Sequence, residues 1–123
     1  MRITQAFQFE AAHWLPRVPA THKCARMHGH SYRVEVTLAG PVRDDGMVVD
    51  FFDIEADFAA ILDALDHRLL NEVEGLSNPT AETIAQWIHQ RIRAPEGAVV
   101  FAVKVFETPN SWAEYRGEAA GER

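Results

Sequence analysis

Apolar and polar side chains alternate along three stretches of this chain, with the period of two that turns one face of a β-strand toward a core. The alternation is regular over residues 31–39 and less regular over residues 3–11. A third run covers residues 98–106 and precedes a short apolar segment around Trp112 and Tyr115. The pattern predicts a strand in each stretch and a short last strand. The expected buried faces are Ile3, Phe7, Phe9 and Ala11, then Tyr32, Val34, Val36 and Leu38, then Val99, Phe101, Val103 and Val105.

Turn-forming residues follow the second of these strands. Gly40-Pro41 and Asp44-Asp45-Gly46 are typical of turns, and an apolar segment at residues 47–50 comes directly after them. We therefore expect residues 47–50 to return beside residues 31–39 as the antiparallel partner in a hairpin.

The period changes to that of a helix in two other segments. From Asp53 to Leu65 apolar residues recur at helical spacing, and Asp53 is expected to cap the helix. A second amphipathic helix is expected after Asn78-Pro79-Thr80, with His89 at its surface and with Pro95-Glu96-Gly97 ending it. The expected buried stripes are Ile54, Phe58, Ile61, Leu62 and Leu65 in the first helix and Ile84, Trp87, Ile88 and Ile92 in the second.

The order of these elements predicts an α+β fold with an antiparallel sheet and both helices on one face. Residues 1–117 form the expected single domain, whereas the small and charged residues 118–123 are expected to fray. An open sheet leaves strand edges that can pair with another chain, so we expect the protein to assemble into a homo-oligomer.

Charge and composition narrow the function classes. The chain has 123 residues and a formal net charge of -6, which gives no electrostatic basis for binding nucleic acid or an anionic membrane. We find no secretory signal and no apolar run of membrane-spanning length, so a cytoplasmic protein is expected. The single cysteine, Cys24, cannot form an intrachain disulfide and remains available for packing, metal binding or catalysis.

Three histidines gather close to that cysteine. His28 and His30 are two residues apart, so in extended backbone their side chains point the same way. His13, at the end of the first predicted strand, can join them if the two strands pair. Three imidazoles are a donor set typical of a zinc site that keeps one position open for water or substrate. An isolated His-x-His is more often fortuitous, and the third histidine and the thiol shift the balance toward metal binding.

The role of Cys24 stays open between three possibilities: a buried apolar residue, a fourth metal ligand, or a reactive group. The segment around it is polar and contains His22, Lys23 and Arg26, and nearby cations favour a thiolate. A thiolate that forms near neutral pH is an effective proton acceptor.

Two acidic positions complete the candidate chemistry. Asp66 and His67 adjoin each other after the first helix, where surface charge is the ordinary explanation. Glu107 ends an apolar strand, where it is either solvated or able to accept two hydrogen bonds from an N–C–N edge.

The chain resembles the 6-pyruvoyl-tetrahydropterin synthase superfamily, and within it the branch that forms carboxytetrahydropterin. The similarity extends over nearly the whole chain. The Cys-x-x-x-His-Gly-His spacing resembles the carboxy-forming, queuosine-pathway branch, whereas eukaryotic pyruvoyl-forming members carry an insertion there. The matching segments are Phe9-Glu10-Ala11-Ala12-His13, residues 22–31, Val49-Asp50-Phe51, Leu65-Asp66-His67, Leu70-Asn71, Asn78-Pro79-Thr80-Ala81-Glu82, Glu107-Thr108 and Tyr115-Arg116-Gly117.

The resemblance implies a role for each candidate residue. It makes the three histidines ligands of one Zn²⁺ per subunit, and it makes Cys24 a proton acceptor relayed through His67 and Asp66. Glu107, beside Thr108, matches the acid that binds the pterin's amidine edge and is often counted in the relay. The implied fold is the tunnelling fold, an antiparallel sheet with two helices on one face. It assembles into barrels and then hexamers with sites at subunit junctions.

The implied reaction converts 7,8-dihydroneopterin triphosphate and water to 6-carboxy-5,6,7,8-tetrahydropterin, acetaldehyde and triphosphate. Lys23, Arg26 and Arg68 are candidates for contact with the triphosphate. Two alternatives remain. One is the pyruvoyl-forming enzyme, which eliminates triphosphate without cleaving the side chain. The other is a non-catalytic zinc module in which Cys24 is the fourth ligand.

Overall fold

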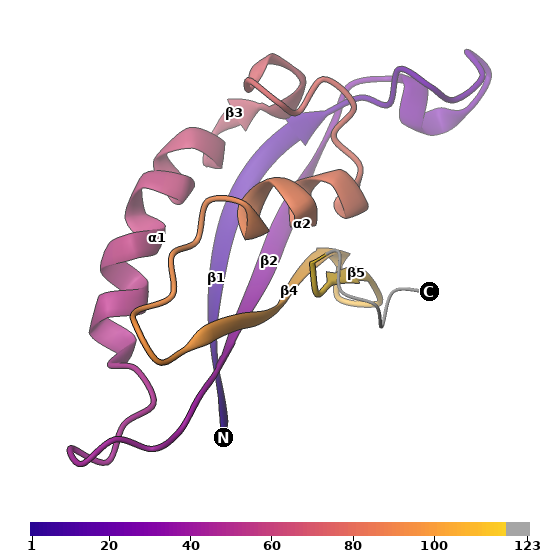
Figure 1. The fold of residues 1–123 in the computed structure, drawn as a ribbon. Coiled ribbons are helices and arrows are strands. Elements are labelled where there is room, and N and C mark those ends of the chain that lie inside the picture. The colour runs from indigo at the N-terminus through magenta and orange to yellow at the C-terminus, as the bar shows by residue number, and fades with distance from the viewer. Residues whose placement is uncertain (118–123) are drawn as a thin grey trace.

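Two twelve-residue strands, β1 (Arg2–His13) and β2 (His28–Ala39), pair antiparallel over their full length and form the centre of the sheet (Figure 1). β4 (Val99–Thr108) pairs with the other edge of β2, and β5 (Ser111–Tyr115) pairs with β4. The computed structural model describes residues 1–117, so the expected fraying of 118–123 lies outside the described residues. The strands predicted from alternation are confirmed.

Both helices, α1 (Phe51–Leu65) and α2 (Ala81–His89), cover the same face of this sheet (Figure 1). α1 packs on β1, where the rings of Phe7 and Phe58 stack with centroids 4.0 Å apart. α2 packs on β4 and β5, and its Ile84 and Ile88 are fully buried. The predicted α+β class is confirmed. None of the helices within residues 1–117 is long and apolar enough to cross a membrane.

The hairpin predicted at residues 47–50 is wrong, because β2 pairs with β1 and β4 and that segment forms no strand. Val48 and Val49 are both buried, at 6% and 3% exposure, so consecutive side chains enter the core instead of alternating. Asp50 then caps α1 by accepting a hydrogen bond from the backbone N–H of Phe52 at 2.9 Å. The cap is therefore Asp50 and not Asp53.

Two irregularities of the sheet were also not predicted. β3 (Arg68–Leu69) pairs parallel to β1 at Ala11 and Ala12, so the sheet is mixed instead of purely antiparallel. A bulge in the β2–β4 register leaves Phe101 without a partner residue and shifts the alternation of β4. As a result Val99 is exposed, although the uninterrupted pattern placed it on the buried face.

α2 is shorter than predicted and its last residue is not at the surface. The helix ends at His89, with Gln90 as its C-cap, well before Pro95. The ring of His89 packs edge-on against Tyr115, with centroids 5.1 Å apart. Its Nε2 is buried and has no hydrogen-bond partner among the described residues. Burial lowers the pKa of His89 below its ordinary value of 6.5.

This lowered pKa predicts a loss of stability in mild acid. The unfolded chain takes up a proton at His89 at a higher pH than the folded chain does. The free energy of unfolding is therefore expected to be highest above about pH 6.5 and to fall as the pH drops below it. Urea unfolding of the wild type and of His89→Phe, from neutral to mildly acidic pH, measures this. The variant should lose less stability than the wild type, and equal losses would contradict the expectation.

Candidate metal centre and active site

The three predicted histidines meet at one end of the β1–β2 pair. Strand register places His13 opposite His28 and Ala11 opposite His30, so all three rings project from the helix-covered face. Their ligand nitrogens all lie within 4.8 Å of one another. His13 is fully buried, whereas His28 and His30 are half-buried. The expected three-imidazole cluster is present.

Two backbone carbonyls determine the tautomers in this cluster. The Nδ1 of His13 lies 2.7 Å from the carbonyl oxygen of Pro79, and the Nδ1 of His28 lies 2.7 Å from that of Arg26. A carbonyl can only accept, so both Nδ1 atoms carry hydrogen and donate. In the neutral rings both Nε2 atoms then present lone pairs, and these face each other at 3.0 Å. Two lone pairs at this separation repel each other unless a proton or a metal ion lies between them, and three converging imidazoles are suited to a metal ion.

The ring of His30 is also available to bind a metal ion. The Nε2 of His30 is buried and has no hydrogen-bond partner within residues 1–117. Burial lowers the pKa of both His13 and His30, which favours the neutral form that binds metal. Three imidazole nitrogens suit Zn²⁺ among the common biological cations.

Glu107 links the histidines to a neighbouring cavity. Its carboxylate oxygens lie 3.7 Å from Nε2 of His30 and 3.9 Å from Nε2 of His13. It also lines a cavity of about 360 Å³ together with Leu15, Thr80, Ala81, Glu82, Ser111, Trp112 and Ala113. A small ligand in this cavity would contact the carboxylate while one end approaches the histidines.

Glu82 is a lining residue that the sequence analysis did not single out. It lies in the first turn of α2 and adds a second carboxylate to the cavity. The only signal in the sequence was its place in the segment Asn78-Pro79-Thr80-Ala81-Glu82. Thr108, expected beside the substrate, ends β4, and its hydroxyl accepts the backbone N–H of Asn110 at 3.2 Å.

Cys24 lies in the short 3₁₀ helix η1 (Lys23–Ala25), within the loop that projects beyond the ends of β1 and β2 (Figure 1). The loop is held by a hydrogen bond from the backbone N–H of Leu15 to the Cys24 carbonyl at 2.8 Å. The thiol is half-buried and free. Within residues 1–117 the candidate metal group consists of the three histidines and does not include Cys24, so the geometry gives no support to a closed four-ligand site.

Asp66 and His67 form a contacting pair, although neighbours in sequence rarely face each other. His67 has a left-handed backbone with φ of 58°, and its N–H donates to the Glu10 carbonyl at 2.6 Å. This turn brings Nδ1 of His67 to 3.0 Å from the Asp66 carboxylate. The same oxygen accepts the backbone N–H of Glu10, which with His67 lowers the pKa of Asp66. With Nδ1–H donated to Asp66, Nε2 of the exposed His67 is free to accept a proton.

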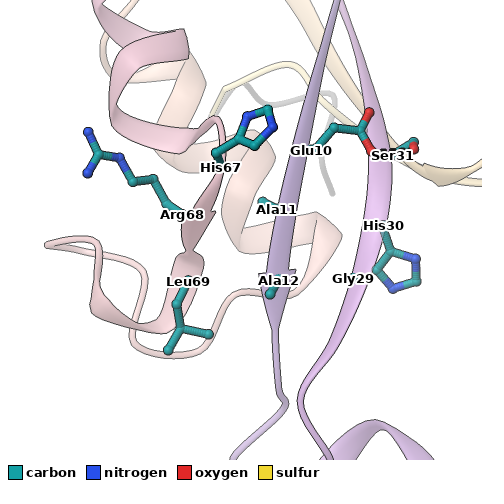
Figure 2. Close-up of a pocket in the computed structure, with 9 residues that line it drawn as sticks. All are labelled: Glu10, Ala11, Ala12, Gly29, His30, Ser31, His67, Arg68 and Leu69. Carbon is teal, nitrogen blue, oxygen red and sulfur yellow. Dashed lines mark hydrogen bonds between the residues drawn. The ribbon is translucent and has the colours of Figure 1, made fainter.

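This pair lies at the outer edge of β1, and it shares a groove with only one histidine of the cluster, His30. The groove has a volume of about 480 Å³, and Figure 2 shows the ring of His67 on the outer side of β1 and the ring of His30 on the far side of β2. Glu10 and Ser31 also line this groove, and the Ser31 hydroxyl donates a hydrogen bond to the Glu10 carboxylate at 2.6 Å. Within one chain the members of the predicted relay are therefore separated: Cys24 lies in the projecting loop, and Asp66 and His67 lie at the edge of β1.

The three basic residues predicted to contact a phosphate also lie in two different places. Lys23 and Arg26 flank Cys24 in the projecting loop and are exposed. Arg68 lines the groove, but its guanidinium extends away from β1 in Figure 2 and donates to the Asp63 carbonyl at 3.3 and 3.4 Å. The geometry favours the loop residues over Arg68 for binding an anion near the three histidines.

The fold and the site together define a small α+β protein with a cluster of three histidines that could hold a metal ion, beside an acid-lined cavity. The family described as 6-pyruvoyl tetrahydropterin synthase matches residues 2–118. The chain belongs to this family. The predicted resemblance is thus confirmed, and so is the prediction of an enzyme.

Individual relatives agree with this assignment. The chain is 39% identical to the 6-carboxy-5,6,7,8-tetrahydropterin synthase of Synechocystis sp. over 119 residues, which cover 92% of this chain and 91% of the relative. It is 34% identical to the enzyme of the same name from Bacillus subtilis, with 97% and 87% covered. The structure of Caenorhabditis elegans 6-pyruvoyl tetrahydropterin synthase superposes with a TM-score of 0.84 at 26% identity and covers 96% of both chains.

Proposed function

We propose that this protein is a zinc-dependent lyase that converts 7,8-dihydroneopterin triphosphate and water to 6-carboxy-5,6,7,8-tetrahydropterin, acetaldehyde and triphosphate. The main support for a bound metal is the contact between Nε2 of His13 and Nε2 of His28, whose lone pairs face each other at 3.0 Å. The names of the relatives and the Cys-x-x-x-His-Gly-His spacing support the carboxy-forming branch. The product would serve 7-deazapurine (queuosine) biosynthesis.

The cavity beside the cluster suits the pterin ring. Glu107 can accept two hydrogen bonds from the amidine edge of a pterin, and its position near His13 and His30 would place the side chain of that pterin at the metal. Zn²⁺ held by the three histidines would supply Lewis acidity to the hydroxyl groups of the substrate. Glu107 and Thr108 are the proposed substrate-binding residues.

Proton transfer is assigned to Cys24 and to the Asp66–His67 pair. The Cys24 thiolate removes a proton from the substrate side chain, and His67, oriented by Asp66, relays it. Because the pair lies beside a different part of the sheet from the histidines, we propose that a second copy of the chain brings its His67 to this Cys24. A homohexamer, a dimer of trimers, is the assembly expected from the resemblance.

The product decides between the two branches of the family. Purified protein loaded with Zn²⁺ and given 7,8-dihydroneopterin triphosphate is expected to release acetaldehyde and triphosphate in equal amounts, because the side chain is cleaved after triphosphate leaves. Coupling the reaction to alcohol dehydrogenase and NADH measures the acetaldehyde. Protein stripped of metal by a chelator is the control. Triphosphate release with a pyruvoyl pterin and no acetaldehyde would assign the chain to the pyruvoyl-forming branch.

A further inference from the structure

His13, a ligand of the proposed metal site, donates a hydrogen bond to a residue that is distant in sequence. Its Nδ1–H donates to the carbonyl of Pro79, which precedes α2, at 2.7 Å. Both residues are buried, so water cannot replace this hydrogen bond. The bond also decides which nitrogen of His13 faces the metal, because a ring that donates from Nδ1 presents Nε2 as the ligand.

The Pro79 carbonyl is itself held by the first turn of α2. Pro79 lies between Asn78 and Thr80, and the backbone N–H of Thr80 donates to the Asn78 carbonyl at 2.9 Å. The hydroxyl of Thr83 donates to that same Asn78 carbonyl at 2.6 Å. The backbone N–H of Thr83 donates to the hydroxyl of Thr80, the N-cap, at 3.1 Å. Thr83 therefore contacts the residues on both sides of Pro79.

We propose that the Thr83 hydroxyl is a positioning group for the metal centre. It fixes the peptide of Asn78 and Pro79, so that the Pro79 carbonyl holds His13 in the tautomer and ring orientation that bind the metal. Ile84 and Ile88 anchor α2 in the core, so the carbonyl is tied to a rigid helix and not to a free loop. This inference rests on the proposed metal site and adds a residue that does not touch the metal or the substrate.

A purely structural role for Thr83, as part of the helix cap, predicts different behaviour. In Thr83→Val the backbone N–H still donates to Thr80, so the cap remains, and valine is close to threonine in shape and helix propensity. The variant removes the hydroxyl, with its short hydrogen bond to the Asn78 carbonyl and its longer contacts at 3.2 Å with the carbonyl and the hydroxyl of Thr80. Loss of a direct outer contact to a metal-bound histidine lowers metal affinity roughly 10–100-fold, and because Thr83 acts through the Pro79 carbonyl we expect the lower end of that range.

The experiment measures Zn²⁺ affinity by competition with a chromophoric chelator, together with urea unfolding of the metal-free proteins. Thr83→Val is expected to bind Zn²⁺ about 10-fold more weakly than the wild type, and Thr83→Ser, which keeps the hydroxyl, is expected to bind Zn²⁺ as the wild type does. Asp50→Ala, the matched control, removes the cap of α1 and should lower stability without changing affinity. Unchanged affinity in Thr83→Val would overturn the proposal.

His13→Ala separates this proposal from the metal site on which it rests. If His13→Ala abolishes tight Zn²⁺ binding and Thr83→Val does not change it, only the positioning role fails. If His13→Ala binds as the wild type does, the metal centre itself is wrong. Nitrogen-15 NMR of histidine-labelled wild-type protein gives a measurement that needs no variant. It should show His13 with hydrogen on Nδ1, and hydrogen on Nε2 would overturn the proposal.

Discussion

Replacement of Cys24 by alanine is expected to lower turnover by about 10²–10⁴-fold while the protein stays folded and keeps its Zn²⁺. The reason is that the thiolate is the proposed proton acceptor, whereas the proposed metal ligands are the three histidines alone. Steady-state rates with 7,8-dihydroneopterin triphosphate, zinc content of the purified protein and thermal unfolding measure the three parts of this result. Cys24→Ser is the matched control for size, and it should be nearly as inactive because a hydroxyl is far less acidic than a thiol.

The opposite outcome would identify a different kind of protein. If Cys24→Ala lost both Zn²⁺ and its fold, the thiol would be a structural ligand and the site would be closed. The position of Cys24 in the projecting loop, outside the three-histidine group, is the reason we expect the catalytic result.

Removal of the His67 imidazole is expected to have a similar effect on rate and none on metal binding. His67→Ala should lose about 10²–10⁴-fold in turnover, because His67 is the proposed relay for the proton that Cys24 accepts. It should keep Zn²⁺, since its ring lies beside β1, away from the ring of His30 (Figure 2). Wild-type turnover in the folded, zinc-loaded variant would exclude the relay.

Mixing the two inactive variants tests whether a second copy completes the site. If one copy supplies Cys24 and another supplies His67, random assembly of equal amounts of Cys24→Ala and His67→Ala chains regenerates about a quarter of the sites, because a symmetric junction receives each intact residue half of the time. Denaturation of the mixture followed by joint refolding, with the separately refolded variants as controls, measures the recovery. No recovery would place the whole relay within one chain.

The parts of the fold that the sequence predicted are those with a strong local period. Residues 31–39 alternate and form most of β2, and the segment after Asn78-Pro79-Thr80 forms α2 with Thr80 as its cap. The prediction failed at residues 47–50, where two adjacent valines are both buried and the period of two is absent. β3 is only two residues long and so carries no detectable pattern.

In the candidate site, too, the sequence predicted the contacts that follow from local spacing and missed those that depend on tertiary structure. The spacing of His28 and His30 was sufficient to place both rings on one face of a strand, because side-chain direction in a strand repeats every two residues. The contact between Asp66 and His67 was not deducible from such spacing, because it depends on the left-handed backbone at His67 and on a hydrogen bond to Glu10. Glu82 was missed because a solvated acid in the first turn of a helix is common.

The sequence by itself determined the fold class, the family and the three-histidine donor set, since local periodicity and closely spaced motifs carry that information. Only the tertiary structure decided how the donors are used. The packing of α2 on the sheet brings the Pro79 carbonyl to His13, and the end of β4 brings Glu107 to His13 and His30. The groups in each of these contacts are far apart along the chain, so their distances depend on how whole elements pack and not on any local pattern.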